Sequence, residues 1–64
     1  MITPEHLADM IEDEIKDAMK YLKCAIACKE SRPDLSEMFA ELSGEEMKHM
    51  MRLHEKLSAM YGNM

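Results

Sequence analysis

The chain has 64 residues, a formal charge of −5, nine methionines, and only two glycines and two prolines. This length allows one small domain, here 1–64, and a domain of this size is weakly stable unless a metal, a disulfide or a partner subunit supports it. The negative charge argues against nucleic acid or an anionic membrane surface as a partner. No apolar run reaches the roughly 20 residues that span a bilayer, and the composition is typical of a helical protein.

The N-terminal residues and the two cysteines indicate the cellular compartment. The first residues lack the basic and apolar regions of a signal peptide. Cys24 and Cys28 lie four residues apart on one expected helix, where they cannot bridge each other without strain. They do not form the paired motifs of a zinc site either. We therefore expect a cytoplasmic protein with two small, reduced, buried cysteines; a redox or soft-metal role is the less favoured reading.

The first helix is expected over about residues 4–30. Thr3 fits its N-cap and Pro4 its first position. Further along, apolar or small residues recur at spacings of four and three, which indicates an amphipathic helix that packs along one face. This first-helix stripe consists of Leu7, Ile11, Glu14, Ala18, Tyr21, Ala25 and Cys28. Its only polar groups are the Glu14 carboxylate and the Tyr21 hydroxyl.

A turn at residues 31–33 ends the first helix, because a residue that precedes a proline is pushed away from helical conformation. Ser31 or Asp34 can cap the helix that follows, and Asp34 with Glu37 has the spacing of a capping box. A connection this short makes the two helices antiparallel neighbours.

The second helix is expected over about residues 34–61, and Gly62 with Asn63 supplies a stop signal. Gly44 lies inside it, where its missing side chain would suit close packing. The second-helix stripe is apolar except for one carboxylate and one imidazole. It consists of Leu35, Met38, Leu42, Glu46, His49, Leu53, Leu57 and Met60.

The polar residues of the two stripes are expected to lie close together in the folded hairpin. Glu46 and His49 form a Glu-x-x-His pair, and residues three apart share one face of a helix. At a rise of about 1.5 Å per residue, Glu14 lies at the same height in the hairpin. A carboxylate in an apolar stripe is costly unless a positive group neutralises it. The three residues therefore predict half of a metal site.

A lone hairpin leaves one side of its stripes open to water, so we expect a homodimer. The expected fold is all-α: a two-helix antiparallel hairpin that dimerises into a four-helix bundle. The bundle centre would hold four glutamates and two histidines, the ligand set of di-iron and di-manganese carboxylate bundles. Oxygen ligands with one nitrogen favour iron or manganese. We expect two irons per dimer, with manganese or zinc as substitutes.

With Glu14 followed seven residues later by Tyr21, and Glu46 with His49 on the next helix, the sequence resembles the ferritin-like superfamily. It is most similar to one half of a rubrerythrin-type bundle, over roughly residues 12–57. It lacks the second helix pair and the rubredoxin domain of rubrerythrin, which removes the built-in electron donor. Half-length relatives such as the encapsulated ferritins form their metal site between subunits.

The resemblance implies roles for the four residues. Glu14 would be a terminal or bridging carboxylate, Glu46 the bridging ligand and His49 the nitrogen ligand. Tyr21 would hydrogen-bond a ligand carboxylate, although it is equally well read as a core aromatic residue. The implied activity is oxidation of Fe(II) by dioxygen or hydrogen peroxide, in iron handling or oxidant defence.

Several alternative interpretations of the sequence stay open. The hairpin could be a non-catalytic interaction module that associates through the same stripes, or a subunit of a larger ring of dimers that stores metal. Met47, Met50 and Met51 near the imidazole suggest copper(I), but methionine-rich helices are usually adaptable cores or interfaces. His54 is expected in solvent. Arg52 either neutralises a nearby carboxylate or faces water.

Overall fold

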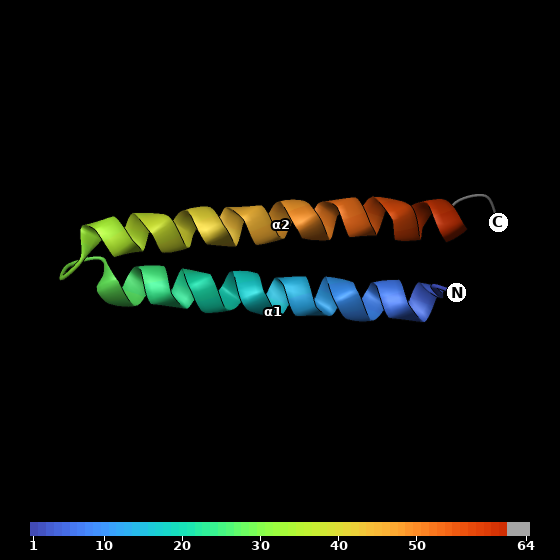
Figure 1. The fold of residues 1–64 in the computed structure, drawn as a ribbon, viewed down its shortest axis with the longest axis horizontal. Helices are drawn as coiled ribbons and strands as arrows, with labels where there is room; N and C mark the ends of the chain where they lie inside the picture. Colours follow the sequence, from blue (N-terminus) through green and yellow to red (C-terminus); the bar gives the residue numbers. More distant parts are fainter. Residues whose placement is uncertain (62–64) are drawn as a thin grey trace.

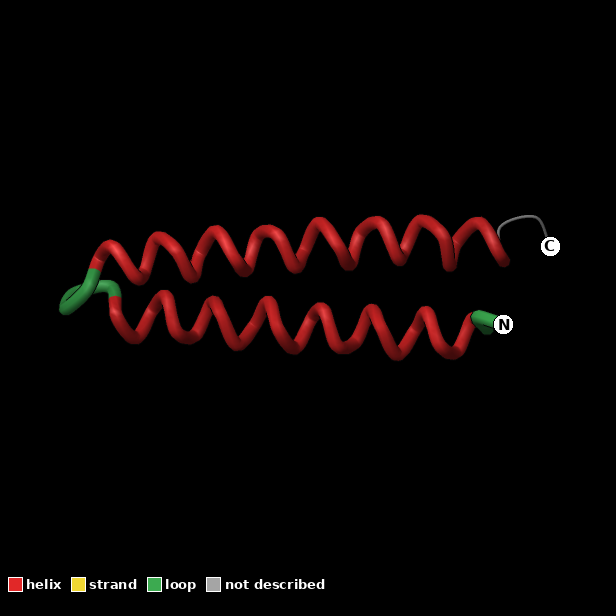
Figure 2. Tube along the Cα trace, viewed as in Figure 1, coloured by secondary structure: helices red, strands yellow, loops and turns green. Residues whose placement is uncertain are grey.

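The computed structural model describes residues 1–61, which form two long antiparallel helices joined by a short turn (Figure 1). Helix α1 spans Pro4–Cys28 and helix α2 spans Pro33–Tyr61. Between the two helices and around them, the described part of the chain contains only loop and turn, with no strand (Figure 2). The expected all-α helical hairpin is therefore confirmed. Neither helix in residues 1–61 is long and apolar enough to cross a membrane.

Helix α1 begins where the sequence predicts. The Thr3 hydroxyl accepts a hydrogen bond from the backbone N–H of His6 at 3.2 Å, and the Thr3 N–H donates to Nδ1 of His6 at 3.3 Å. These reciprocal bonds form a capping box in which histidine takes the place usually held by Glu or Gln. His6 is exposed, and its side chain also fixes the start of the helix.

The end of α1 and the capping of α2 differ from the expectation. Helix α1 ends at Cys28, short of residue 30. The Arg32 N–H donates to the Cys28 carbonyl at 2.8 Å, which closes the turn. Helix α2 begins at Pro33 with Arg32 just before it, so the predicted cap at Ser31 or Asp34 is wrong. Proline favours the first helical position because its ring fixes φ and it has no N–H to leave unpaired.

Asp34 instead lies inside the first turn of α2. Its carboxylate accepts two hydrogen bonds from the Arg32 guanidinium, at 3.1 and 2.9 Å. This bidentate pair holds the pKa of Asp34 below its usual range. The capping box predicted for Asp34 with Glu37 therefore does not form. The predicted stop at residues 62–63 lies outside the described residues.

Two alanines and two serines join the two helices. Ala18 and Ala25 are the buried residues of the described chain, at 4% and 6% exposure. The Ser43 hydroxyl donates to the Ala18 carbonyl at 2.8 Å, and the Ser36 hydroxyl donates to the Ala25 carbonyl at 2.6 Å. Both pairs repeat after seven residues, the period at which two helices keep facing each other.

The packed face of α1 is the predicted first-helix stripe, whose members are all buried or half-buried. The packed face of α2 is rotated from its predicted stripe: Met38, His49 and Met60 are exposed, and the half-buried residues include Ser36, Phe39, Ser43 and Met50. Gly44 meets no side chain within 4 Å, so close packing at this glycine is absent.

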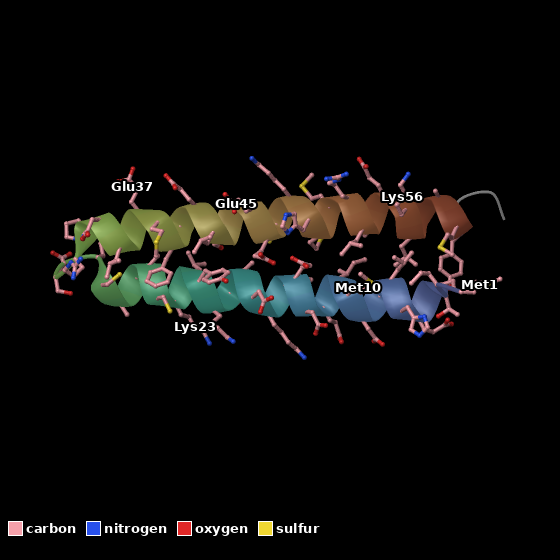
Figure 3. The ribbon with its side chains drawn as sticks, viewed as in Figure 1. Met1, Met10, Lys23, Glu37, Glu45 and Lys56 are labelled. Carbon is pink, nitrogen blue, oxygen red and sulfur yellow. The ribbon has the colours of Figure 1, made fainter. Side chains whose placement is uncertain are left out.

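Many large apolar side chains stay exposed on this thin hairpin. They include Met10, Ile15, Met19, Leu22, Ile26, Met38, Met47, Met51 and Met60, each at 42% exposure or more. Charged side chains such as Lys23 and Glu37 point outward from the pair of helices (Figure 3). An exposed apolar surface of this extent is typical of a chain that associates.

Candidate metal centre

Glu14 of α1 and the pair Glu46 and His49 of α2 converge at the middle of the hairpin. Nδ1 of His49 lies 3.4 Å from Oε2 of Glu14 and 3.9 Å from Oε1 of Glu46. One ligand atom from each residue lies within 4.8 Å of the others. The helix spacing brings Glu46 and His49 to one face, and the antiparallel packing brings Glu14 opposite them.

The three side chains differ in exposure. Glu46 and Glu14 are 20% and 25% exposed, whereas His49 is 55% exposed. The two carboxylates therefore sit between the helices, and the imidazole stands at the open edge. This arrangement follows from the rotation of α2, which places His49 at the edge of its contact with α1, where it still reaches Glu14.

Oε2 of Glu14 is a buried atom without a hydrogen-bond partner among the described residues. Its 3.4 Å contact with His49 is close enough for an ion pair, but the geometry is too poor for a hydrogen bond. A buried carboxylate oxygen without a partner is unfavourable, because no hydrogen bond within the protein replaces the hydration that it has lost. This atom thus requires a cation or a proton donor.

The two glutamates also affect each other. The pKa of Glu46 is raised above its usual value mainly because a protonated Glu46 could donate a hydrogen bond to the nearby Glu14 carboxylate. Partial burial and the negative charge of Glu14 raise the pKa of Glu46 further, while His49 opposes the shift. Two carboxyl groups this close favour sharing one proton. A divalent cation can replace that proton and hold both carboxylates in the ionised form.

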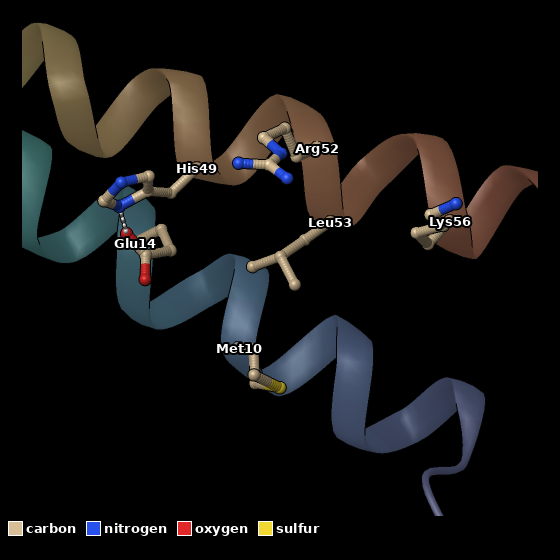
Figure 4. A pocket seen from close by; sticks show the side chains of 6 residues that line it. All are labelled: Met10, Glu14, His49, Arg52, Leu53 and Lys56. Atoms are coloured by element: carbon tan, nitrogen blue, oxygen red, sulfur yellow. Dashed lines mark ion pairs between the residues drawn. The ribbon is translucent and has the colours of Figure 1, made fainter.

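An open groove of about 370 Å³ runs beside the cluster (Figure 4). Its lining consists of Met10, Glu14, His49, Arg52, Leu53 and Lys56. Arg52 lies on this groove and has no ion-pair partner within residues 1–61, so it faces solvent in the single chain. The lining role of Lys56 was missed from the sequence, although its spacing of seven from His49 places it on the same face.

Tyr21 lies two turns along α1 from Glu14 and is half-buried. Its ring stacks on Phe39, with centroids 6.3 Å apart and an interplanar angle of 22°. Its hydroxyl forms no hydrogen bond within the described residues, so the expected bond to a ligand carboxylate is not made in the single chain. In the single chain Tyr21 packs against Phe39, and its hydrogen bond to a ligand carboxylate stays a prediction.

The two cysteines lie apart from this cluster. Cys24 and Cys28 are free and half-buried. The thiol of Cys28 makes a long contact of 3.9 Å with the Ala25 carbonyl. Among the described residues, the three-residue group of Glu14, Glu46 and His49 is the one set of His, Cys, Asp and Glu side chains arranged to hold a metal.

The fold and the cluster define a class of protein: a ferritin-like helical hairpin with a carboxylate–histidine site at mid-height. A family model described as Rubrerythrin matches residues 5–64. The chain belongs to the rubrerythrin family, which confirms the resemblance to a rubrerythrin-type half-bundle. Members of this family bind iron, and membership indicates a di-iron carboxylate protein. No curated protein and no solved structure matched the chain.

Proposed function

We propose that two copies of this chain assemble a di-iron carboxylate centre that oxidises Fe(II) with dioxygen or hydrogen peroxide. The role would be iron handling or oxidant defence. The observation that carries the proposal is the buried, unpartnered Oε2 of Glu14 beside Glu46 and His49. It is unfavourable in the metal-free chain and satisfied by a cation.

The donor set fits iron. Two carboxylates and one imidazole are hard and borderline ligands that suit iron or manganese, and also accept zinc. The two carboxylates of one chain balance the charge of one divalent ion, so a homodimer would hold two. The half-bundle fold supports this partner, because a single chain supplies half of the four-glutamate, two-histidine set. Assembly of dimers into a higher oligomer is compatible with the same site.

Each side chain at the site would have its own role. Glu14 and Glu46 would bind the metal after releasing their shared proton, and His49 would bind as neutral imidazole. Bound iron would supply the redox capacity that the chain itself lacks. Met10 and Leu53 would limit water around the ligands, and the groove would admit a small oxidant.

Two further parts of the proposal concern the cellular location and an alternative function. The free thiols of Cys24 and Cys28 support a cytoplasmic, reducing location. The exposed apolar side chains favour a second candidate function, a non-catalytic hairpin that serves only for association. Metal binding separates the two candidates.

The test is native mass spectrometry of protein reconstituted anaerobically with Fe(II), beside the metal-free form. We expect two irons per dimer, loss of both in Glu46→Ala, and oxygen or peroxide consumption by the loaded protein. Glu37→Ala is the matched control, since Glu37 is an exposed glutamate of α2 outside the cluster. A dimer that binds no iron would rule out the oxidase and leave the interaction module.

A further inference from the structure

One edge of α2 carries charges that change sign at the metal site. The stripe consists of Glu41, Glu45, His49, Arg52 and Lys56, at successive spacings of four, four, three and four. Such spacings keep side chains on one side of a helix. All five side chains are exposed. The two acidic residues come before the imidazole and the two basic residues after it; we call this set the charge stripe.

The charge stripe is unfavourable within a single chain. Glu41 and Glu45 are like charges four apart, and so are Arg52 and Lys56, which destabilises an isolated helix. None of the four has an ion-pair partner within residues 1–61. Glu45 and Arg52 lie seven residues apart, too far to pair with each other in one chain. A second molecule that presents the opposite charges would relieve this arrangement.

A second copy laid antiparallel along α2 meets this requirement. The pair Glu45 and Arg52 and the pair Glu41 and Lys56 share one midpoint, immediately before His49. A two-fold axis through that midpoint places Glu45 of each copy opposite Arg52 of the other. The same axis places Glu41 of each copy opposite Lys56 of the other. Two pairs with different separations thus define the same register.

We propose that a second copy docks on the groove face with its α2 antiparallel to α2 of the first. Glu45 and Glu41 of each copy then pair with Arg52 and Lys56 of the other. This inference rests on the proposed function, because it names the partner and register that would complete the proposed site.

The position of the groove agrees with this register. Arg52 and Lys56 line the same groove as Glu14 and His49 (Figure 4). The axis crosses α2 at the level of the ligands, so the partner brings its own ligand set to the open side of His49. The docked copy also covers Met10 and Leu53, whose apolar surface adds to the interface.

The opposite face of the hairpin offers a weaker match. Helical periodicity places Ile15, Leu22 and Ile26 of α1 with Met47 of α2 on that side, and all four are exposed. This face is apolar but carries neither a metal ligand nor a self-complementary set of charges. Charge complementarity fixes register and orientation, and only the groove face has it.

Charge reversal in mixed variants tests the register. In Glu45→Arg two arginines would face each other across the axis, and in Arg52→Glu two glutamates would do so. We expect each variant alone to dimerise at least tenfold more weakly than the unchanged protein in sedimentation and native mass spectrometry. A mixture of the two variants restores opposite charges at both contacts, so we expect a heterodimer of normal affinity. High salt should reduce the difference.

Matched controls are Glu12→Arg and Lys23→Glu, exposed residues of α1 away from the groove, and both should dimerise normally. All variants are measured without metal and with Mn(II). The register is wrong if Glu45→Arg and Arg52→Glu each dimerise normally, if their mixture does not recover, or if the unchanged protein stays monomeric in both conditions.

The outcomes for docking and for function are separable. Charge-selective pairing without iron binding would remove the proposed function and leave the docking. Two irons per dimer with no response to charge reversal would remove the docking and leave the proposed function.

Discussion

Nδ1 of His49 lies 3.4 Å from Oε2 of Glu14, and this contact joins the two helices at mid-height through an atom without a hydrogen-bond partner. The contact combines a half-exposed imidazole with a buried carboxylate oxygen. Such a pair is poorly satisfied in the free chain and well suited to a shared cation. The first two predictions follow from this relationship.

Replacing Glu14 with alanine should abolish metal-dependent stabilisation. At Fe(II) concentrations 100-fold above the dissociation constant, a bound ion raises the free energy of unfolding by about 2.7 kcal/mol. We expect this increase in anaerobic thermal melts of the unchanged protein, its reversal by a chelator, and its absence in Glu14→Ala. Without metal, Glu14→Ala should be no less stable, because an unpartnered buried oxygen is removed. Glu12→Ala serves as control, and an Fe(II) response that survives in Glu14→Ala would contradict the predicted ligand.

Replacing Glu46 with glutamine should stabilise the metal-free protein in a pH-dependent way. The folded-state pKa of Glu46 is raised, so its favourable contribution is complete below the unfolded-state pKa, about 4.3. That contribution is lost as the pH rises through the folded-state pKa. Glutamine imitates the protonated form at every pH. The melting temperature of Glu46→Gln should therefore exceed that of the unchanged protein at pH 8 and match it near pH 4; an equal difference at both pH values would contradict the raised pKa.

The serine hydroxyls that join the helices should contribute measurably to stability. Ser36 and Ser43 each donate to a carbonyl of α1, and such hydrogen bonds contribute about 0.5–1.5 kcal/mol each. We expect Ser36→Ala and Ser43→Ala to lower the free energy of unfolding by this amount in urea titrations. Ser58→Ala, at an exposed position of α2, should have little effect. A loss no greater than that of Ser58→Ala would show that these bonds add nothing over water.

Enlarging the buried alanine nearest to the metal ligands should separate the helices. Ala18 is 4% exposed and lies one turn from Glu14, and overpacking of this kind costs about 1–3 kcal/mol. We expect Ala18→Leu to unfold at lower temperature and to bind Fe(II) more weakly, because Glu14 moves away from α2. Ala27→Leu adds the same volume at an exposed site and should change neither property. Unaltered iron affinity in Ala18→Leu would show that helix spacing does not position the site.

The helical hairpin and the height of its polar residues follow from the amino-acid sequence alone. Regular spacings of three and four define an amphipathic helix without reference to other segments. Pro4 marks the start of the first helix and Pro33 marks the break between the two helices, because proline restricts its own backbone and that of the residue before it. A fixed rise per residue places Glu14 level with Glu46 and His49. These properties are local, so they can be read along one chain.

The side of each helix that meets the other is set by packing between the two helices. The small side chains of Ala18 and Ala25 let two serines of α2 reach carbonyls of α1, and this contact rotates α2 so that His49 stands at the open edge. Periodicity along one helix cannot reveal that rotation, because it depends on which side chains of two helices fit closely together. The same rotation leaves Oε2 of Glu14 without a hydrogen-bond partner and turns the charge stripe toward the groove.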